Sequence, residues 1–274
     1  MSNKKVTSNL MGGLGNYLFQ IAAAYGYALK YGYKPFFNPQ TSKKVHRSID
    51  VYLENILRNV DIDYNSYQCI NYAEPGFNYT EIPNFDNMLN KPQFSDGVYL
   101  SGYYQNSKYF EGFDKEIKDL FSCDEKTRDL IYSKFYYLKT SEYKTCAIHV
   151  RRGDYVNLQD THPVQGLNYF MKAIRKIPKD CHYMIFSDDP KWCKDNFEGL
   201  LPDYEVVEGQ SDIEDLYTMS MCDHNIICNS TFSWWAAFLN NNQEQIVVAP
   251  KRWFGPKLSG HDTKDIYCEG WYKI

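Results

Sequence analysis

The sequence lacks the features that mark several large classes of protein. It has no apolar run approaching about 20 residues, so no helix is expected to span a bilayer. Two lysines near Met1 are followed by no apolar stretch of signal-peptide length, so no leader is expected. Basic residues are not in excess either, with 30 Lys and Arg against 34 Asp and Glu. That balance argues against a nucleic-acid partner, and any anionic ligand must be held locally.

Metal and nucleophile motifs are also missing. The eight cysteines are scattered, with no C-x-x-C pair and no His/Cys cluster at zinc spacing. They indicate free thiols in a cytoplasmic protein, with peripheral association at the inner membrane face left open. No G-x-S-x-G elbow exists. Asp61-Ile62-Asp63 comes nearest to a D-x-D metal–diphosphate motif, and it is expected to lie at the surface.

The length of 274 residues fits two domains of roughly 130 residues each. We place their boundary between residues 143 and 144, and the last residues are free to pack back on the first domain. Residues 38–90 show little clear periodicity. The remaining elements expected in the first half are a strand over Val6–Met11, a helix over Tyr17–Tyr31, a strand running into an aromatic turn over Gly97–Gln105, and a helix over Ser107–Phe121.

The second half alternates more cleanly, which predicts a parallel sheet flanked by helices. Strands are expected at Cys146–Val150, His182–Phe186, Glu205–Val207, Ile226–Cys228 and Gln245–Ala249. Helices are expected at Asn168–Lys176, Asp189–Asn196, Asp212–Cys222 and Phe232–Leu239. Ser211 and Glu214 fit the capping box that begins a helix.

Three segments follow strands of this sheet, and the carboxyl ends of parallel strands are where ligands collect. The first runs from His149 to Asp154 and contains two arginines. Period-two alternation places His149 and Arg151 on one face and Arg152 on the other. Arginine matches phosphate oxygens and stays charged, so either one suits a diphosphate. The alternative is an ion pair with Asp154 that ties the loop down.

The second segment is Ser187-Asp188-Asp189-Pro190. A carboxylate here would accept both the ring N–H and the exocyclic amine of guanine. The alternative is that one aspartate caps the next helix, with Pro190 at its first position. The doublet then leaves the other aspartate free.

The third segment runs from Asn229 through Ser230, Thr231 and Phe232 into a helix of aromatics and alanines. The first backbone N–H groups of that helix would form a phosphate seat. The tryptophans at 234 and 235 are expected to anchor the core.

A glycine loop follows the first strand of the chain. Gly12, Gly13 and Gly15 precede Asn16 and a helix, so the backbone can turn tightly and approach a ligand. A dinucleotide fingerprint would need Gly or Ala at Leu18, and no G-K-[ST] follows. Neither standard nucleotide motif is met.

Taken together, these blocks resemble the α-1,2-fucosyltransferases, family 11 of the inverting glycosyltransferases. The resemblance covers most of the chain. It rests on Met11–Asn16 with Phe19-Gln20, on Leu100–Gln105, on His149–Tyr155, on Asp215–Cys222 and on Asn229–Leu239.

The resemblance implies an α/β fold of GT-B type, with two Rossmann-like domains facing a cleft. Residues 1–143 would be the acceptor side and residues 144–274 would bind GDP-L-fucose, with no metal and no other cofactor. The activity implied is transfer of L-fucose to the 2-hydroxyl of a terminal galactose in a glycan. Other linkages (α-1,6 or protein O-fucosylation) and a non-catalytic GDP- or sugar-binding protein stay as alternatives.

The resemblance also implies site residues. Arg152, Asp154 and Asn16 are the expected catalytic residues. The expected donor-binding residues are Gly12, Gly13, His149, Arg151, Arg152, Ser187, Asp188, Asp189, Asn229, Ser230, Thr231 and Phe232. Related enzymes often carry an arginine in the glycine loop, where this chain has Gly13-Leu14. Asp154 is either a general base or a brace for an arginine, since an oxocarbenium-like route needs little base.

Overall fold

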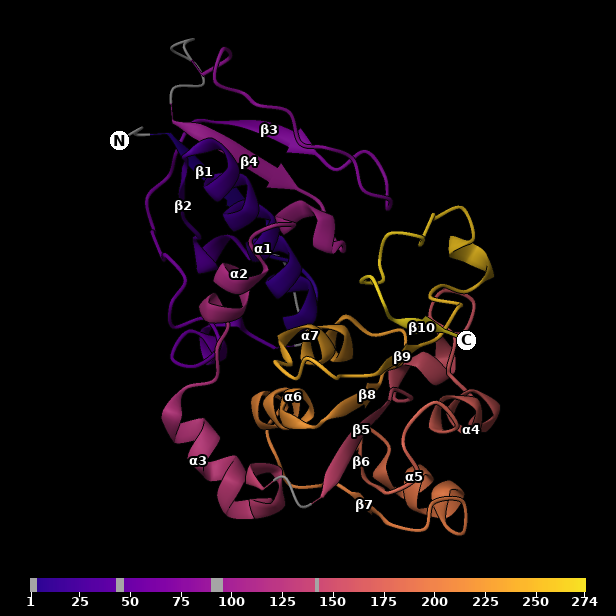
Figure 1. The fold of residues 1–274 in the computed structure, drawn as a ribbon. Helices are drawn as coiled ribbons and strands as arrows, with labels where there is room; N and C mark the ends of the chain where they lie inside the picture. Colours follow the sequence, from indigo (N-terminus) through magenta and orange to yellow (C-terminus); the bar gives the residue numbers. More distant parts are fainter. Residues whose placement is uncertain (1–3, 43–46, 90–95, 141–142) are drawn as a thin grey trace. The chain divides into compact units, whose positions relative to one another are not determined.

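The computed structural model describes residues 4–42, 47–89, 96–140 and 143–274. The chain forms two compact units, shown along the chain in Figure 1. Unit 1 comprises Met1–Ser122 with His261–Tyr267, and unit 2 comprises Cys123–Gly260 with Cys268–Ile274. The division therefore follows Ser122, whereas the sequence analysis placed it after residue 143. The intervening helix α3 (Glu125–Lys134) contacts α6 (Asp212–Met221) of unit 2.

Unit 1 is built on a parallel four-stranded sheet in the order β2-β1-β4-β3. Its strands are β1 (Lys5–Ser8), β2 (Lys34–Pro35), β3 (Cys69–Ala73) and β4 (Gly97–Ser101). Helix α1 (Leu14–Tyr31) packs on β1 and buries most of its residues. The expected strands at β1 and β4 and the expected helix α1 are confirmed. Strands β2 and β3 had no clear sequence signal.

The helix expected over Ser107–Phe121 is wrong as one element. The structure has a 3-10 turn, η4 (Ser107–Phe110), followed by α2 (Asp114–Leu120). Gly112 lies between them at φ 84°. This left-handed backbone is open to glycine and interrupts a helix, so one helical stretch becomes two short elements.

Unit 2 is built on a parallel six-stranded sheet in the order β10-β9-β8-β5-β6-β7. Its strands are β5 (Lys144–Val150), β6 (Cys181–Ser187), β7 (Tyr204–Val206), β8 (His224–Ile226), β9 (Val247–Ala249) and β10 (Tyr272–Lys273). Helices α4 (Leu167–Ile174) and α5 (Pro190–Phe197) cover one face of the sheet, and α6 and α7 (Thr231–Leu239) cover the other (Figure 1). The expected α/β class is confirmed, with all five expected strands and all four helices present within a few residues.

Short 3-10 turns complete the described elements: η1 (Pro39–Thr41), η2 (Ile49–Tyr52), η5 (Tyr136–Lys139), η6 (Asp154–Asn157) and η7 (Pro256–Leu258).

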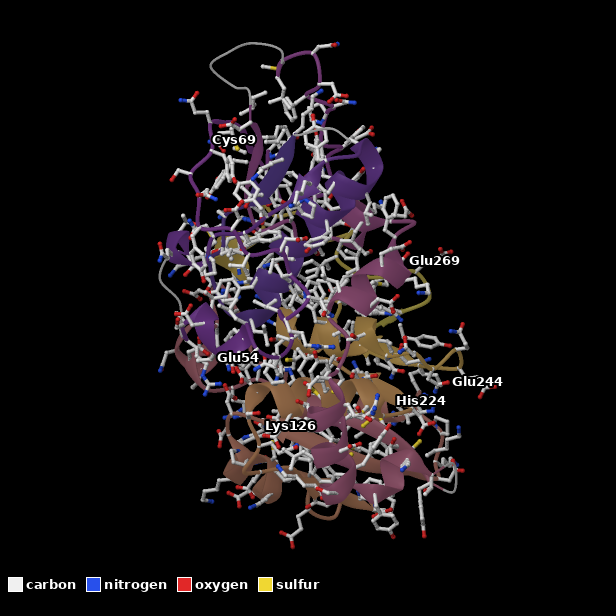
Figure 2. The ribbon with its side chains drawn as sticks, turned by 90° about the vertical axis from the view of Figure 1, so that its left-hand side faces the viewer. Glu54, Cys69, Lys126, His224, Glu244 and Glu269 are labelled. Carbon is white, nitrogen blue, oxygen red and sulfur yellow. The ribbon has the colours of Figure 1, made fainter. Side chains whose placement is uncertain are left out.

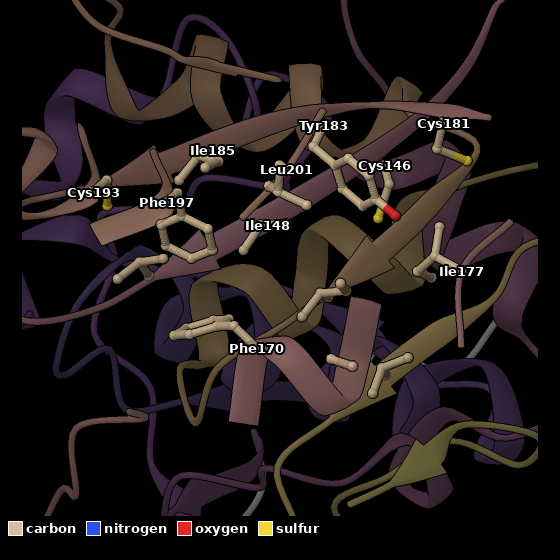
Figure 3. Packing of buried hydrophobic residues seen from close by; sticks show 14 of the residues in the cluster. Cys146, Ile148, Phe170, Ile177, Cys181, Tyr183, Ile185, Cys193, Phe197 and Leu201 are labelled. Carbon is tan, nitrogen blue, oxygen red and sulfur yellow. The ribbon is translucent and has the colours of Figure 1, made fainter. Parts of the chain in front are cut away.

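The core of unit 2 lies between the sheet and helices α4 and α5. Alternate β5 residues, Cys146, Ile148 and Val150, are fully buried there. Phe170 of α4 and Phe197 of α5 meet them from the helices (Figure 3). The intervening β5 residues therefore face α6 and α7, which decides where the site residues point.

Two further structural expectations of unit 2 are confirmed, the capping box and the buried tryptophans. Ser211 and Glu214 form the capping box at the start of α6. Trp234 and Trp235 are fully buried. His224, labelled in Figure 2, accepts a hydrogen bond at Nδ1 from the backbone N–H of Ile246 at 3.1 Å and is buried.

The C-terminal segment contributes residues to both units. Residues 261–267 belong to unit 1, where Lys108 Nζ lies 2.6 Å from Asp265 Oδ1 and Phe77 contacts the His261 ring. The chain then returns, and β10 pairs with β9 in unit 2. All eight cysteines are free thiols. No helix in the described part of the chain is long and apolar enough to cross a membrane.

Candidate functional site

The loop that follows β5 holds the two arginines at the carboxyl edge of the unit 2 sheet. β5 pairs with β6 on one side and with β8 on the other, so the loop begins between two neighbouring strands. The expected alternation is confirmed. Arg151 lies over the Tyr155 ring, whereas Arg152 stacks on Trp192 of α5, with its guanidinium carbon 4.2 Å from the centroid of the ring. The two guanidinium groups therefore have different surroundings.

Arg151 joins two carboxylates. Its Nη2 lies 2.6 Å from Asp154 Oδ1, and its Nη1 lies 2.9 Å from Asp188 Oδ2. The ion pair with Asp154, which the sequence left as an alternative to a phosphate role, is therefore present. The arginine side chain keeps a third of its surface exposed.

Arg152 is held by the aspartate doublet. Its backbone N–H donates to Asp188 Oδ1 at 2.8 Å, and its Nε lies 3.1 Å from Asp189 Oδ2. A Cβ on Gly153 would lie 2.4 Å from Asp188 Oδ2, so this close approach requires glycine.

Asp189 is also the cap of α5. It accepts the backbone N–H of Trp192 at 3.1 Å, with Pro190 at the first helical position, and its own N–H donates to Ser187 Oγ. The expected cap is confirmed. The expectation that the other aspartate stays free is wrong, because Asp188 is bonded to both arginines.

The four residues from Asn229 to Phe232, which lead into the first turn of α7, comprise one buried residue and three half-buried ones. Asn229 is buried; its Nδ2 donates to the Trp253 carbonyl at 3.0 Å and its Oδ1 accepts from Gln165 at 2.9 Å. Both polar atoms of its side chain are therefore bonded to neighbouring loops. The Ser230 side chain makes no capping hydrogen bond to α7, and the half-buried residues are Ser230, Thr231 and Phe232.

His149 is buried beneath this helix start. Its ring lies 5.6 Å from the Phe232 ring, and its Nδ1 lies 3.1 Å from Cys228 Sγ. Burial, together with the positive charge of Arg151, lowers the pKa of His149 to about 3. The imidazole is therefore neutral at physiological pH.

An aromatic cluster that the sequence did not identify lies beside Arg151. Tyr155 stacks on His162 with ring centroids 5.0 Å apart, and His162 also contacts Phe254. The Tyr155 hydroxyl donates to the Asn229 carbonyl at 3.3 Å. The cluster gives the charged loop an apolar wall.

A hollow of about 200 Å³ opens beyond the ends of β6 and β7. It is lined by Ser187, Pro190, Val207, Glu208, Gly209, Gln210 and Asp215. Asp215 has a buried carboxylate oxygen without a hydrogen-bond partner. Burial, together with the neighbouring charges of Glu214 and Asp212, raises the pKa of Asp215 to about 7. A buried, unsatisfied acceptor in a hollow is suited to a ligand with N–H donors.

The expected site residues of unit 1 form a separate group. Gly12 has φ 91°, and a Cβ there would lie 2.2 Å from Asn16 Nδ2. Asn16 Oδ1 accepts from Gln105 Nε2 at 2.9 Å, which joins the glycine loop to the turn after β4. Gly13 is the N-cap of α1, without a side-chain capping bond.

Across the described ranges, no three His, Cys, Asp or Glu side chains group as metal ligands. Asp61 and Asp63, the D-x-D letters, bond to Tyr25 and to Lys5, respectively.

The chain matches the sequence pattern of glycosyl transferase family 11 over residues 2–274. Three curated relatives span much of it. The O-antigen biosynthesis glycosyltransferase WbnK of Escherichia coli is 30% identical over 97% of this chain and 99% of its own length. An α-1,2-colitosyltransferase of Escherichia coli is 27% identical over 91% and 92%, respectively. A galactoside 2-α-L-fucosyltransferase of Caenorhabditis elegans is 32% identical over 53% of this chain and 43% of its own length.

The fold is similar to that of NodZ from Bradyrhizobium, an α-1,6-fucosyltransferase co-crystallised with GDP. The TM-score is 0.56 at 17% identity, covering 87% of this chain and 93% of NodZ. The expected GT-B type of α/β fold is thereby confirmed.

Proposed function

The chain belongs to glycosyltransferase family 11 and is an enzyme of fucosyltransferase type, and we propose that it transfers L-fucose from GDP-L-fucose to the 2-hydroxyl of a terminal galactose. The linkage follows the names of the colitosyltransferase and of the galactoside fucosyltransferase among its relatives. Inversion at the fucose carbon follows from the family resemblance.

The observation that carries the donor proposal is the arginine pair beside the uncapped start of α7. Both features lie at one edge of the unit 2 sheet. Arg151 is bonded there to Asp188, and Phe232 at the start of α7 contacts the His149 ring. A nucleoside diphosphate leaving group develops negative charge as the sugar departs. Two guanidinium groups and a helix N-terminus stabilise that charge without a metal.

We assign the base of the donor to the hollow at Asp215. Its carboxylate, whose buried Oδ1 has no hydrogen-bond partner, has two oxygens that could accept the ring N–H and the exocyclic amine of guanine together, a pairing that adenine does not offer. This assignment replaces Asp188 and Asp189 as guanine readers, since those carboxylates already hold the arginines. Ser187 lines the same hollow and keeps its donor-site role.

The remaining roles complete the proposal. Asp154 is ion-paired with Arg151 and serves as the general base or as a brace for that arginine. Asn16 and the Gly12-Gly13 loop act from unit 1, which we assign to the acceptor. The proposed partners are GDP-L-fucose and a galactose-terminated glycan.

Colitose is the second candidate for the transferred sugar, because the α-1,2-colitosyltransferase aligns with 91% of this chain. The arginine pair, the start of α7 and Asp215 are assigned to the nucleotide in either case. The residues that discriminate between fucose and colitose would be those that contact the donor sugar next to the acceptor.

The test is a transfer assay with GDP-fucose and a β-galactoside in the presence of EDTA, followed by linkage analysis. We expect an α-1,2-fucosylated product and undiminished rate in EDTA. Transfer only from GDP-colitose would establish the second candidate. An α-1,6 product, or loss of activity in EDTA, would count against the proposal. GDP binding by calorimetry without any turnover would indicate a non-catalytic binder.

A further inference from the structure

A buried thiol contacts the imidazole of the proposed donor site. Cys228 Sγ lies 3.1 Å from His149 Nδ1 and 3.8 Å from Ser233 Oγ, and all three residues are buried. Cys228 follows β8 in the chain, whereas His149 belongs to β5. The contact therefore joins the two strand ends on which the phosphate site is built.

The surroundings of the thiol decide which atom carries the proton. Burial raises the pKa of the Cys228 thiol to about 12, so it keeps its hydrogen, while the imidazole stays neutral. The Ser233 hydroxyl and the backbone N–H of Arg151 both face this sulfur as potential donors. With these donors on one side, we infer that the thiol hydrogen points to the closer neighbour, His149 Nδ1, at 3.1 Å.

A neutral imidazole that accepts at Nδ1 must carry its hydrogen at Nε2. We propose that Cys228 is a positioning residue that fixes the Nε2–H tautomer of His149, so that the ring offers an N–H donor to the anionic part of the nucleotide sugar. The inference rests on the proposed donor function. With the opposite tautomer, Nε2 would present a lone pair toward the phosphate oxygens and repel them.

The Phe232 ring supports the same arrangement. Its centroid lies 5.6 Å from that of His149, at the first turn of α7. The ring position is thus set by packing and the ring proton by the thiol. The two controls are separable by mutation, because a change at Cys228 leaves the Phe232 contact in place.

The experiment compares Cys228→Val, which keeps an apolar side chain but removes the donor, with Cys228→Ser, which keeps a hydroxyl donor. Nitrogen NMR of the ligand-free protein reports the tautomer, and calorimetry reports the affinity for GDP. We expect Nε2–H in the wild type and in Cys228→Ser, and a mixed or reversed tautomer in Cys228→Val. GDP affinity should fall about tenfold in Cys228→Val, as for the loss of one hydrogen bond. Cys228→Ser should stay close to the wild type.

The matched controls are Cys146→Val and Cys146→Ser. Cys146 is an equally buried thiol on the strand that carries His149, and its side chain faces the core cluster. These variants report the general cost of changing a buried thiol, and GDP affinity should not change in them.

Three results overturn the inference: Nδ1–H in the wild type, a Cys228→Val protein with an unchanged tautomer, and a changed tautomer with unchanged GDP affinity. The tautomer measurement needs no donor. A failure of the proposed function, seen as no GDP binding by the wild type, is therefore distinguishable from a failure of the tautomer assignment.

Discussion

Replacing Asp215 by asparagine should stabilise the protein and weaken its nucleotide site. The pKa of this carboxyl is raised from 3.8 to about 7, chiefly by burial. A raised carboxyl pKa means that the folded state favours the protonated form. The contribution of protonated Asp215 to the free energy of unfolding is therefore complete below about pH 4 and is lost as the pH rises toward 7.

The size of the effect follows from the displacement of the pKa. About 3 pH units at roughly 1.4 kcal/mol each give up to about 4 kcal/mol of lost stability above pH 7. Asparagine is never ionised, so Asp215→Asn avoids this cost. Its amide also needs hydrogen-bond partners, which reduces the expected gain to about 2 kcal/mol. For domains of this size, that gain raises Tm by several degrees.

Nucleotide affinity should change in the opposite direction. In Asp215→Asn the carboxylate that would accept two N–H groups of guanine is gone. The two charge-assisted hydrogen bonds that it would make are together worth about 3 kcal/mol or more. The Kd for GDP should therefore rise about 100-fold in Asp215→Asn. In the wild type, GDP affinity should increase with pH through about 7, as the carboxylate forms, and this dependence should be absent from the variant.

The assay is thermal unfolding from pH 4 to 8 beside calorimetry with GDP. Asp212→Asn is the matched control, because it removes a carboxylate from the same helical turn at a position outside the lining of the hollow. Both variants lose the favourable contact of an acidic residue with the helix N-terminus, and Asp215→Asn should gain clearly more stability, because Asp212→Asn removes only one of the charges that raise the pKa of Asp215 and leaves its burial unchanged. An Asp215→Asn protein that is less stable at pH 8 would refute the burial argument. Unchanged GDP affinity would refute the guanine assignment.

Three further outcomes are expected. Arg152→Ala, or Arg151→Ala if the first variant shows no effect, should keep the fold but lower kcat/KM for the donor by two to three orders of magnitude, which is about 3 to 4 kcal/mol. Near-normal turnover in both variants would exclude the phosphate role. Asp154→Asn should lose most of its activity; unchanged GDP affinity would identify a general base and weakened affinity a brace. Ser211→Ala should lower the free energy of unfolding by about 1 kcal/mol through loss of the α6 cap, and a change below about 0.3 kcal/mol would contradict the role of the capping box.

The unit 2 sheet was predictable because its buried strands are short apolar runs bounded by polar turns. β5 and β6 are the clearest cases, each ending at a charged or polar segment that lies in the site. β2 and β10 have two residues each and lie at sheet edges. So short an element depends on its neighbour's hydrogen bonds, which no local pattern encodes.

The site was predictable where local geometry decides it. Alternation along β5 separated Arg151 from Arg152, and capping rules placed Asp189 at the start of α5. The role of Asp215 was not predictable in this way. Its carboxyl is buried beside a hollow that it shares with the start of α5, well before it in the chain, and only the fold brings these two elements together.

The ion pairs of Arg151 bear on how the site works once a nucleotide binds. Arg151 is divided between Asp154 and Asp188, and each of these contacts competes with phosphate oxygens for the same guanidinium. The carboxylates hold the arginine in place before the ligand arrives, which limits the entropy lost on binding. A diphosphate that takes over Nη2 would release Asp154 from its ion pair. If Asp154 is the general base, it would lose its ion pair with Arg151 at the moment when the acceptor hydroxyl needs a free carboxylate. In that case the brace role, before the donor binds, and the base role, after it binds, would be two states of one contact.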